Sequence, residues 1–133
     1  MQFELLPHVG TGDLRLNSPR AVVRALLGSL RHTTRVKEPQ ADFYEQEGII
    51  LGYDAQELLE FIEITHPSTA SLGDIDLFGF PLPEVVAKLA AIGGSMPFDD
   101  GSYNYEALGL VLYCPLGNLE SVSVYRDGYY DDL

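Results

Sequence analysis

Apolar side chains between residues 19 and 28 recur with the period of an α-helix. Their spacings of one, three and four residues place them on one side of a helix. Pro19 can open such a helix, Ser18 can cap its first turn and Gly28 can end it. The pattern predicts an amphipathic helix of about nine residues with arginines on its polar side. Its apolar stripe consists of Val22, Val23, Leu26 and Leu27.

On both sides of this helix the apolar period shortens to two, which is the period of a β-strand. Residues 1–12 are expected to form an irregular lead-in, because Pro7, Gly10 and Gly12 interrupt them. Gly48 suits a hairpin turn with positive φ. The predicted order is therefore a strand, a helix and an antiparallel meander. The predicted strands are 14–16, 31–36, 43–46, 49–53 and 59–65.

A degenerate copy of segment 42–65 appears at 102–125. Tyr, Glu, Gly and Leu at positions 44, 45, 48 and 51 recur at 105, 106, 109 and 112, an offset of 61. Leu and Glu at 59 and 60 recur at 119 and 120, an offset of 60. The lead-in pattern restarts as well, since Gly-Asp at 12–13 recurs at 73–74 and Val-Val at 22–23 recurs at 85–86. Such self-similarity predicts an internal duplication.

The duplication divides a single domain, 1–133, into two repeats of about 12–65 and 73–125. Segment 66–72 is expected to be a linker, because it is rich in small and polar residues. Pro83 opens the second predicted helix and Gly93-Gly94 ends it. The tail 126–133 has no counterpart in the first repeat, and its two tyrosines are expected to dock on the domain.

Segment 14–28, LRLNSPRAVVRALLG, resembles the repeat signature of the β-lactamase inhibitor protein-like units, which small outer-membrane assembly lipoproteins of the SmpA/OmlA type share. There, Gly-Met-Thr/Ser leads into a helix that ends in Leu-Leu-Gly, and an antiparallel meander follows. The chain matches this signature at Val23, Leu26, Leu27 and Gly28, and departs from it at positions 17–18. The resemblance implies an α+β fold with one continuous antiparallel sheet, helices on one face and the other face free. In the inhibitor family the free face binds another protein.

Length and composition suit one soluble domain, since 133 residues with 46% hydrophobic side chains can bury a core. No apolar run approaches the roughly 20 residues of a membrane-spanning helix, and the first residues lack the basic region of a secretory signal. The single cysteine, Cys114, rules out an intramolecular disulfide and fits a reducing compartment. These features predict a cytoplasmic protein that does not bind membranes.

Charge is distributed unevenly along the chain. Residues 1–37 carry a net charge of plus 4 and the remainder carries minus 16, which gives minus 12 in total. Such a surface repels nucleic acid and favours encounter with basic partners. Solubility alone is the alternative explanation of the charge.

Catalytic chemistry finds no support in the sequence. No serine lies in a Gly-x-Ser-x-Gly elbow, and Cys114 has apolar neighbours that predict a buried packing residue. His8, His32 and His66 are far apart and lack ligand spacing. We therefore expect a protein that is not an enzyme and that has no catalytic residues, no metal and no cofactor.

The free face of the predicted sheet is the candidate functional surface. In the last strand of each repeat, Ile62 and Ile64 align with Val122 and Val124 and are assigned to the core. The opposite side carries the predicted partner-binding residues, since aromatics on a polar sheet face are typical of interfaces. Cover by the C-terminal tail or by a second copy of the chain is the alternative for the aromatics. The partner-binding residues are Phe61, Glu63, Thr65, Ser123 and Tyr125.

These observations predict an acidic protein-binding module that engages a basic protein through the free sheet face, as an immunity or inhibitor protein does. A second hypothesis is a small-molecule binding protein or an enzyme with a cleft between the repeats. A third is homo-oligomerisation through sheet edges.

Overall fold

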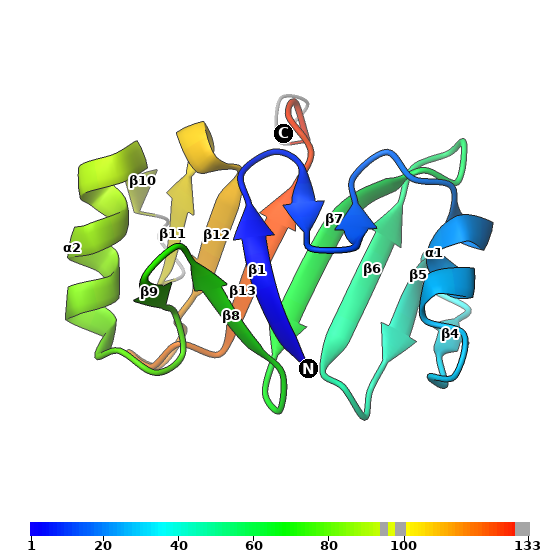
Figure 1. Cartoon of the computed structure of the whole chain (residues 1–133), viewed down its shortest axis with the longest axis horizontal. Coiled ribbons are helices and arrows are strands. Elements are labelled where there is room, and N and C mark those ends of the chain that lie inside the picture. The colour runs from blue at the N-terminus through cyan, green and yellow to red at the C-terminus, as the bar shows by residue number, and fades with distance from the viewer. Residues whose placement is uncertain (94–95, 98–100, 130–133) are drawn as a thin grey trace.

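Two antiparallel meanders form the larger of two sheets in this computed structural model, which describes residues 1–93, 96–97 and 101–129 (Figure 1). In the described part of the chain this sheet has eight strands, in the order β10-β11-β12-β13-β7-β6-β5-β4. The first meander consists of β4 (Thr33–Arg35), β5 (Glu38–Tyr44), β6 (Ile49–Tyr53) and β7 (Leu59–Thr65). The second consists of β10 (Met96–Pro97), β11 (Ser102–Tyr105), β12 (Leu110–Tyr113) and β13 (Ser121–Tyr125).

The two meanders meet where β13 pairs with β7, and the register there sets the two faces of the sheet. Val122 lies opposite Ile64, and Val124 lies opposite Ile62. All four side chains are at most 1% exposed, which confirms their assignment to the core. Because side chains alternate along a strand, the residues between them point to the other side. A row across the core side consists of Asp42, Leu51, Ile62, Val124, Leu110 and Tyr105.

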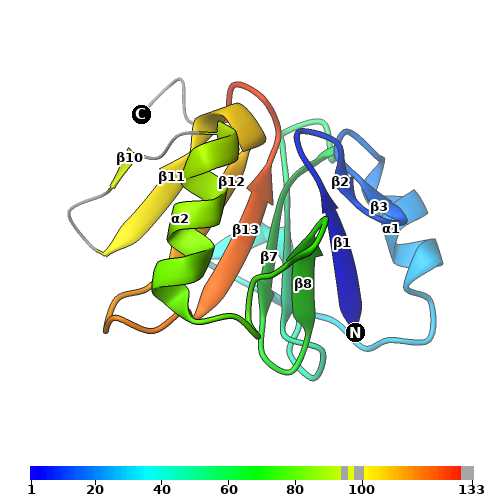
Figure 2. The same cartoon turned by 60° about the vertical axis from the view of Figure 1, so that its left-hand side comes forward.

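A second sheet lies against the core side of the first (Figures 1 and 2). Its order is β3-β2-β1-β8-β9, and β1 and β8 pair in parallel. Inward-facing side chains of this sheet, such as Phe3, Leu5 and Ala70, join the common core. Its strands are β1 (Gln2–Leu6), β2 (Gly10–Thr11), β3 (Leu14–Arg15), β8 (Thr69–Leu72) and β9 (Ile75–Asp76).

The structure confirms the α+β class and corrects the expectation of one continuous sheet. The predicted lead-in 1–12 contains β1 and β2, and the predicted linker 66–72 contains β8. The strands β1 and β8 stabilise each other by pairing, and the paired residues Gln2 and Thr69 are 67 positions apart in the sequence. Their apolar residues cover the central strands of the large sheet, so they form a separate layer instead of extending it.

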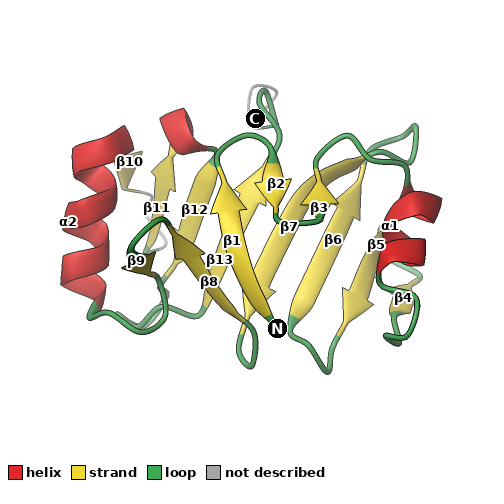
Figure 3. Ribbon diagram, in the orientation of Figure 1, coloured by secondary structure: helices red, strands yellow, loops and turns green. Residues whose placement is uncertain are grey.

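Both helices lie on the same side of the large sheet as the small one (Figure 3). The helix α1 (Arg20–Leu26) begins after Pro19, which is the N-cap and makes no side-chain cap bond. The prediction that Ser18 caps this helix is therefore wrong, since Ser18 joins β7 through the bond from the Leu59 N–H to its carbonyl. The helix α2 (Leu82–Gly93) buries Val85 and Leu89 against the second meander. A short 3₁₀ helix, η1 (Glu106–Leu108), joins β11 to β12.

Candidate functional site

The face of the large sheet opposite α1 and α2, called the open face here, carries a mixture of apolar, hydroxyl and charged side chains. Cross-strand register fixes its members, because partners in neighbouring strands point to the same side. Its central row consists of Asn104, Val111, Ser123, Glu63, Ile50, Phe43 and Thr33. One neighbouring row consists of Tyr125, Phe61, Gly52 and Ala41. The row on the other side consists of Ser102, Tyr113, Ser121 and Thr65.

All five predicted partner-binding residues lie on the open face, where the β13–β7 pairing brings them together. Their exposure differs. Phe61, Glu63 and Thr65 are partly exposed, whereas Ser123 and Tyr125 are buried, at 5% and 3% exposure. The accessible part of the predicted set is therefore on β7.

The C-terminal segment covers the aromatic end of the open face. Tyr129 stacks on Phe61 with ring centroids 5.3 Å apart, and its ring lies 6.0 Å from that of Tyr125. The Tyr125 hydroxyl donates to Asn104 Oδ1 at 2.6 Å. Tyr129 thus docks as the sequence analysis expects of the tail, and the other predicted tyrosine, Tyr130, lies outside the described residues.

Arg126 holds this segment in place at its beginning. Its guanidinium donates to Asp54 Oδ2 at 2.8 Å, to Glu60 Oε2 at 2.8 Å and to Asn17 Oδ1 at 3.1 Å. Its N–H donates to the Glu60 carbonyl. The backbone N–H of Leu58 donates to Asp54 Oδ1, and this bond together with that from Arg126 lowers the pKa of the Asp54 carboxyl.

Replacing Tyr129 with alanine is expected to lower the free energy of unfolding by about 1–2 kcal/mol, because two aromatic contacts and their burial are lost. Urea denaturation measures this loss. Tyr113→Ala is the control on the same face, since Tyr113 is 39% exposed and should cost no more than about 0.5 kcal/mol. Equal losses for the two variants would contradict the docking of Tyr129.

Glu63 is the partly buried carboxylate at the centre of the open face. Burial raises its pKa, and the nearby charge of Glu38 raises it further. In residues 1–93 and 101–129, no cation or hydrogen-bond donor reaches this carboxylate. The Glu63 carboxylate is therefore partly desolvated and depends on water for its remaining hydrogen bonds.

Arg35 shows how a guanidinium sits on this same face. Its Cζ lies 3.8 Å from the centroid of the Phe43 ring. The carboxylates of Glu38 and Glu45 flank it at 4.0 Å and 3.5 Å. Phe43 is consequently buried although no helix covers its face of the sheet.

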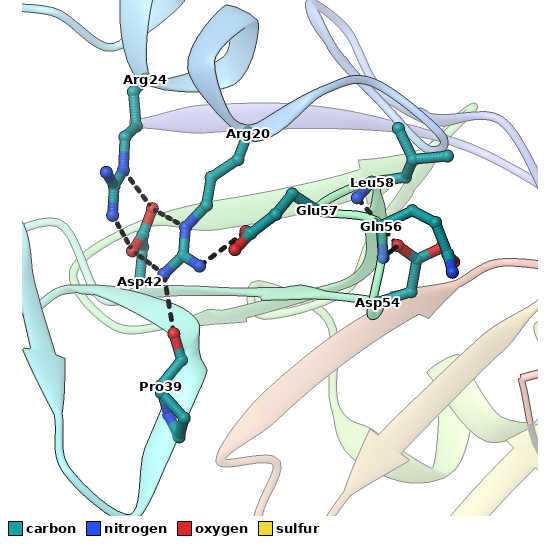
Figure 4. Close-up of polar contacts among 8 residues, drawn as sticks. All are labelled: Arg20, Arg24, Pro39, Asp42, Asp54, Gln56, Glu57 and Leu58. Atoms are coloured by element: carbon teal, nitrogen blue, oxygen red, sulfur yellow. Dashed lines mark hydrogen bonds and ion pairs between the residues drawn. The ribbon is translucent and has the colours of Figure 1, made fainter.

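A partly buried ion cluster on the core side, centred on Asp42, joins α1 to β5 and was not predicted from the sequence (Figure 4). Arg20 Nη2 and Arg24 Nη2 both reach Asp42 Oδ1, at 2.6 Å and 2.7 Å. Arg20 also bonds Glu57 Oε2 at 2.8 Å and the Pro39 carbonyl at 3.2 Å. Asp42 has no exposed side-chain surface.

The two arginines determine the protonation state of Asp42. Burial by itself would raise the pKa of this carboxyl, but the hydrogen bonds from Arg24 and Arg20 outweigh it and lower the pKa to about 2. The same bonds raise the pKa of both arginines. The cluster is therefore fully charged at neutral pH and acts as a structural link.

Ion pairing also changes the picture of charge that the sequence suggests. Arg20, Arg24 and Arg35 all pair with acidic residues between positions 38 and 57. Three of the six basic side chains in segment 1–37 are thus neutralised by ion pairs with acidic residues of the first meander. The positive pole expected from the sequence is correspondingly weakened.

A narrow apolar hollow lies between the second meander and the small sheet. Leu5, Leu110 and Val124 are among the residues that line it, and it is too narrow to hold a water molecule. A wider, open hollow of about 580 Å³ lies beside α1, lined by Arg20, Arg24 and Glu57 among others. The charged groups of that hollow are already engaged with one another or with Asp42.

Cys114 is buried, as its apolar neighbours predict, and burial raises the pKa of its thiol. In the parts of the chain that the structure describes, His, Cys, Asp and Glu side chains form no group of three that could hold a metal ion. No described helix has both the length and the apolar character needed to cross a membrane.

Comparisons with protein-family models, with curated proteins and with solved structures find no match to this chain.

Proposed function

We propose that this chain is a non-enzymatic protein-binding module that engages a basic protein through the open face. The observation that supports it best is the contrast between the two faces of the large sheet. One face is covered by α1, α2 and the small sheet (Figure 2). The other face carries partly exposed Phe61, Thr65 and Ile50 around Glu63, which has no ion-pair partner among the described residues.

The acidic balance supports a basic partner. The formal net charge is minus 12, and five of the eight basic residues already take part in internal ion pairs. Complementary charge speeds association and excludes acidic competitors. A module that covers a basic surface of another protein can act as an immunity or inhibitor protein, and the proposal includes that role.

We also propose that the two meanders are repeats, about 12–65 and 73–125. Helix and meander follow one another in the same order in both segments, and the strand order of the large sheet reverses across the β13–β7 pair. At the sequence offset of 60, Glu63 corresponds to Ser123, and these two residues lie opposite each other. That geometry is expected for a pseudo-two-fold axis through their pair.

Site-specific photocrosslinking in the native host cell tests the binding proposal. A benzoylphenylalanine at Thr65, on the open face, is expected to give adducts with a basic protein. The same group at Gln2, exposed on the outer side of the small sheet, should give none. The adduct yield should fall as salt is raised, because exposed charges are screened.

Three outcomes would count against the proposal. Equal adducts from Thr65 and Gln2 would show that the open face has no special role. Adducts at Thr65 with an acidic protein, with yields that do not depend on salt, would contradict the proposal that complementary charge selects a basic partner. Adducts between two copies of this chain alone would favour homo-oligomerisation instead.

A further inference from the structure

The centre of the open face has the composition of a binding site for a cationic side chain. Glu63 lies between Ile50 of β6 and Ser123 of β13, and Phe61 and Thr65 flank it along its own strand. Its neighbours in the sheet are thus apolar or hydroxyl-bearing. A long basic side chain could bury its aliphatic stem on Ile50 and reach the carboxylate with its charged end.

The carboxylate itself lacks a partner within the described residues. Removing a charge from water without pairing it is unfavourable, and burial raises the pKa of Glu63 accordingly. An incoming cation would replace the remaining water at this partly buried carboxylate and pair with its charge. Each interaction of this kind is strongest where the surrounding surface already excludes water.

Arg35 provides an internal precedent for the kind of cation. On the same face, its guanidinium stacks on Phe43 and lies between two carboxylates. Phe43 is the cross-strand neighbour of Ile50, which in turn neighbours Glu63. A planar guanidinium can stack and form two parallel hydrogen bonds to a carboxylate, whereas a lysine ammonium is a hydrated point charge.

We propose that an arginine side chain of the partner protein anchors the complex, with its guanidinium bound to the Glu63 carboxylate and its stem on Ile50. This inference rests on the proposed function of the open face and specifies the partner's contact residue. Tyr129 bounds the site on the Phe61 side, so the arginine approaches from the Thr65 side.

Peptides provide a probe that does not require the natural partner. Random twelve-residue peptides displayed on phage are selected against the wild-type protein, and the best binders are synthesised. Each is made in two forms, with arginine or with citrulline, which keeps the shape and removes the charge. The arginine form is expected to bind at least tenfold more tightly to the wild-type protein.

The variant Glu63→Gln is expected to abolish that tenfold difference, because the amide keeps the shape of the side chain and loses its charge. Glu120→Gln is the matched control, since Glu120 is exposed and lies immediately before β13, outside the rows of the open face. It should keep the full preference for arginine. Urea denaturation of both variants checks that they fold like the wild-type protein.

Failure of the anchor and failure of the proposed function give different results. Peptides that crosslink from position 65, but bind equally well with citrulline, would overturn the arginine anchor and leave the open face as the binding surface. A preference for arginine that survives Glu63→Gln would do the same. Peptides that crosslink equally from position 2, or a selection without any open-face binder, would overturn both.

Discussion

Replacing Asp42 with alanine is expected to lower the free energy of unfolding by about 3 kcal/mol or more, measured by urea denaturation. Asp42 is fully buried and accepts hydrogen bonds from both Arg20 and Arg24. The alanine variant leaves two positive charges together, and the Arg20 side chain is only 11% exposed. The loss therefore reflects uncompensated charge and not the small change in volume.

The triple variant Arg20→Met, Arg24→Met, Asp42→Leu is the control for this prediction. Buried ion clusters can often be replaced by apolar residues without loss, so it should lie within about 1 kcal/mol of the wild-type protein. The corresponding positions of the second half, at offsets of 63 and 61, are Pro83, Ala87 and Tyr103, which are uncharged. A triple variant as unstable as the single one would contradict this account.

Acid titration separates the charge effect from packing. The pKa of Asp42 lies near 2 in the folded protein and is lowered from its ordinary value. Its contribution to stability is therefore present above about pH 4 and disappears as the pH falls toward 2. The wild-type protein should lose stability over this window, and the triple variant should lose less.

Replacing Gly48 with alanine is expected to cost about 3–4 kcal/mol of unfolding free energy. Gly48 has a φ of +72°, and a Cβ there would overlap the Thr65 carbonyl oxygen and lie 2.6 Å from that of His66. The turn before β6 would have to move away from the end of β7. Gly48 also accepts the Thr65 N–H bond at 2.8 Å, which that movement would break.

Gly73→Ala is the matched control for Gly48. Gly73 has a φ of +56°, but nothing lies within 4 Å of the position where a Cβ would be. It should therefore show only the conformational cost of about 1–2 kcal/mol. Chemical denaturation of both variants gives the comparison, and equal losses would contradict a steric role for the Thr65 and His66 carbonyls.

Elements with a regular apolar period could be predicted from the sequence. The predicted strands 49–53 and 59–65 coincide with β6 and β7, and Gly48 has the positive φ expected of it. In the small sheet only β3 was predicted, as strand 14–16, and the pairing of its strands was not predicted. Its strands are two to five residues long, and the pairing of β1 with β8 depends on residues that are 67 positions apart.

The sequence contains a signal for the ion cluster that only becomes clear with the strand register. Asp42 and buried Tyr44 are two positions apart on β5, so both side chains point to the core side of the sheet. An acid at such a position requires a cation nearby. Arg20 and Arg24, four residues apart on one helix, provide it, but their alignment over β5 follows from tertiary packing.

The open face could be assigned from the sequence, whereas its accessible part could not. Alternation along β7 and β13 places all five predicted residues on one side. Burial of Tyr125 and partial cover of Phe61 depend on where the C-terminal segment lies, which no local pattern encodes.

The pairing of Glu63 with Ser123 also bears on how two copies of the chain meet during folding. If β7 paired with β7 of a second copy in the same register, Ile62 and Ile64 would keep apolar partners on the core side. Glu63 would then lie opposite a second Glu63, and like charges opposite each other destabilise a sheet. Ser123 removes that repulsion only in the correct pairing. Glu63 is therefore expected to disfavour pairing of β7 with a second copy of β7 and to favour pairing with β13 of its own chain.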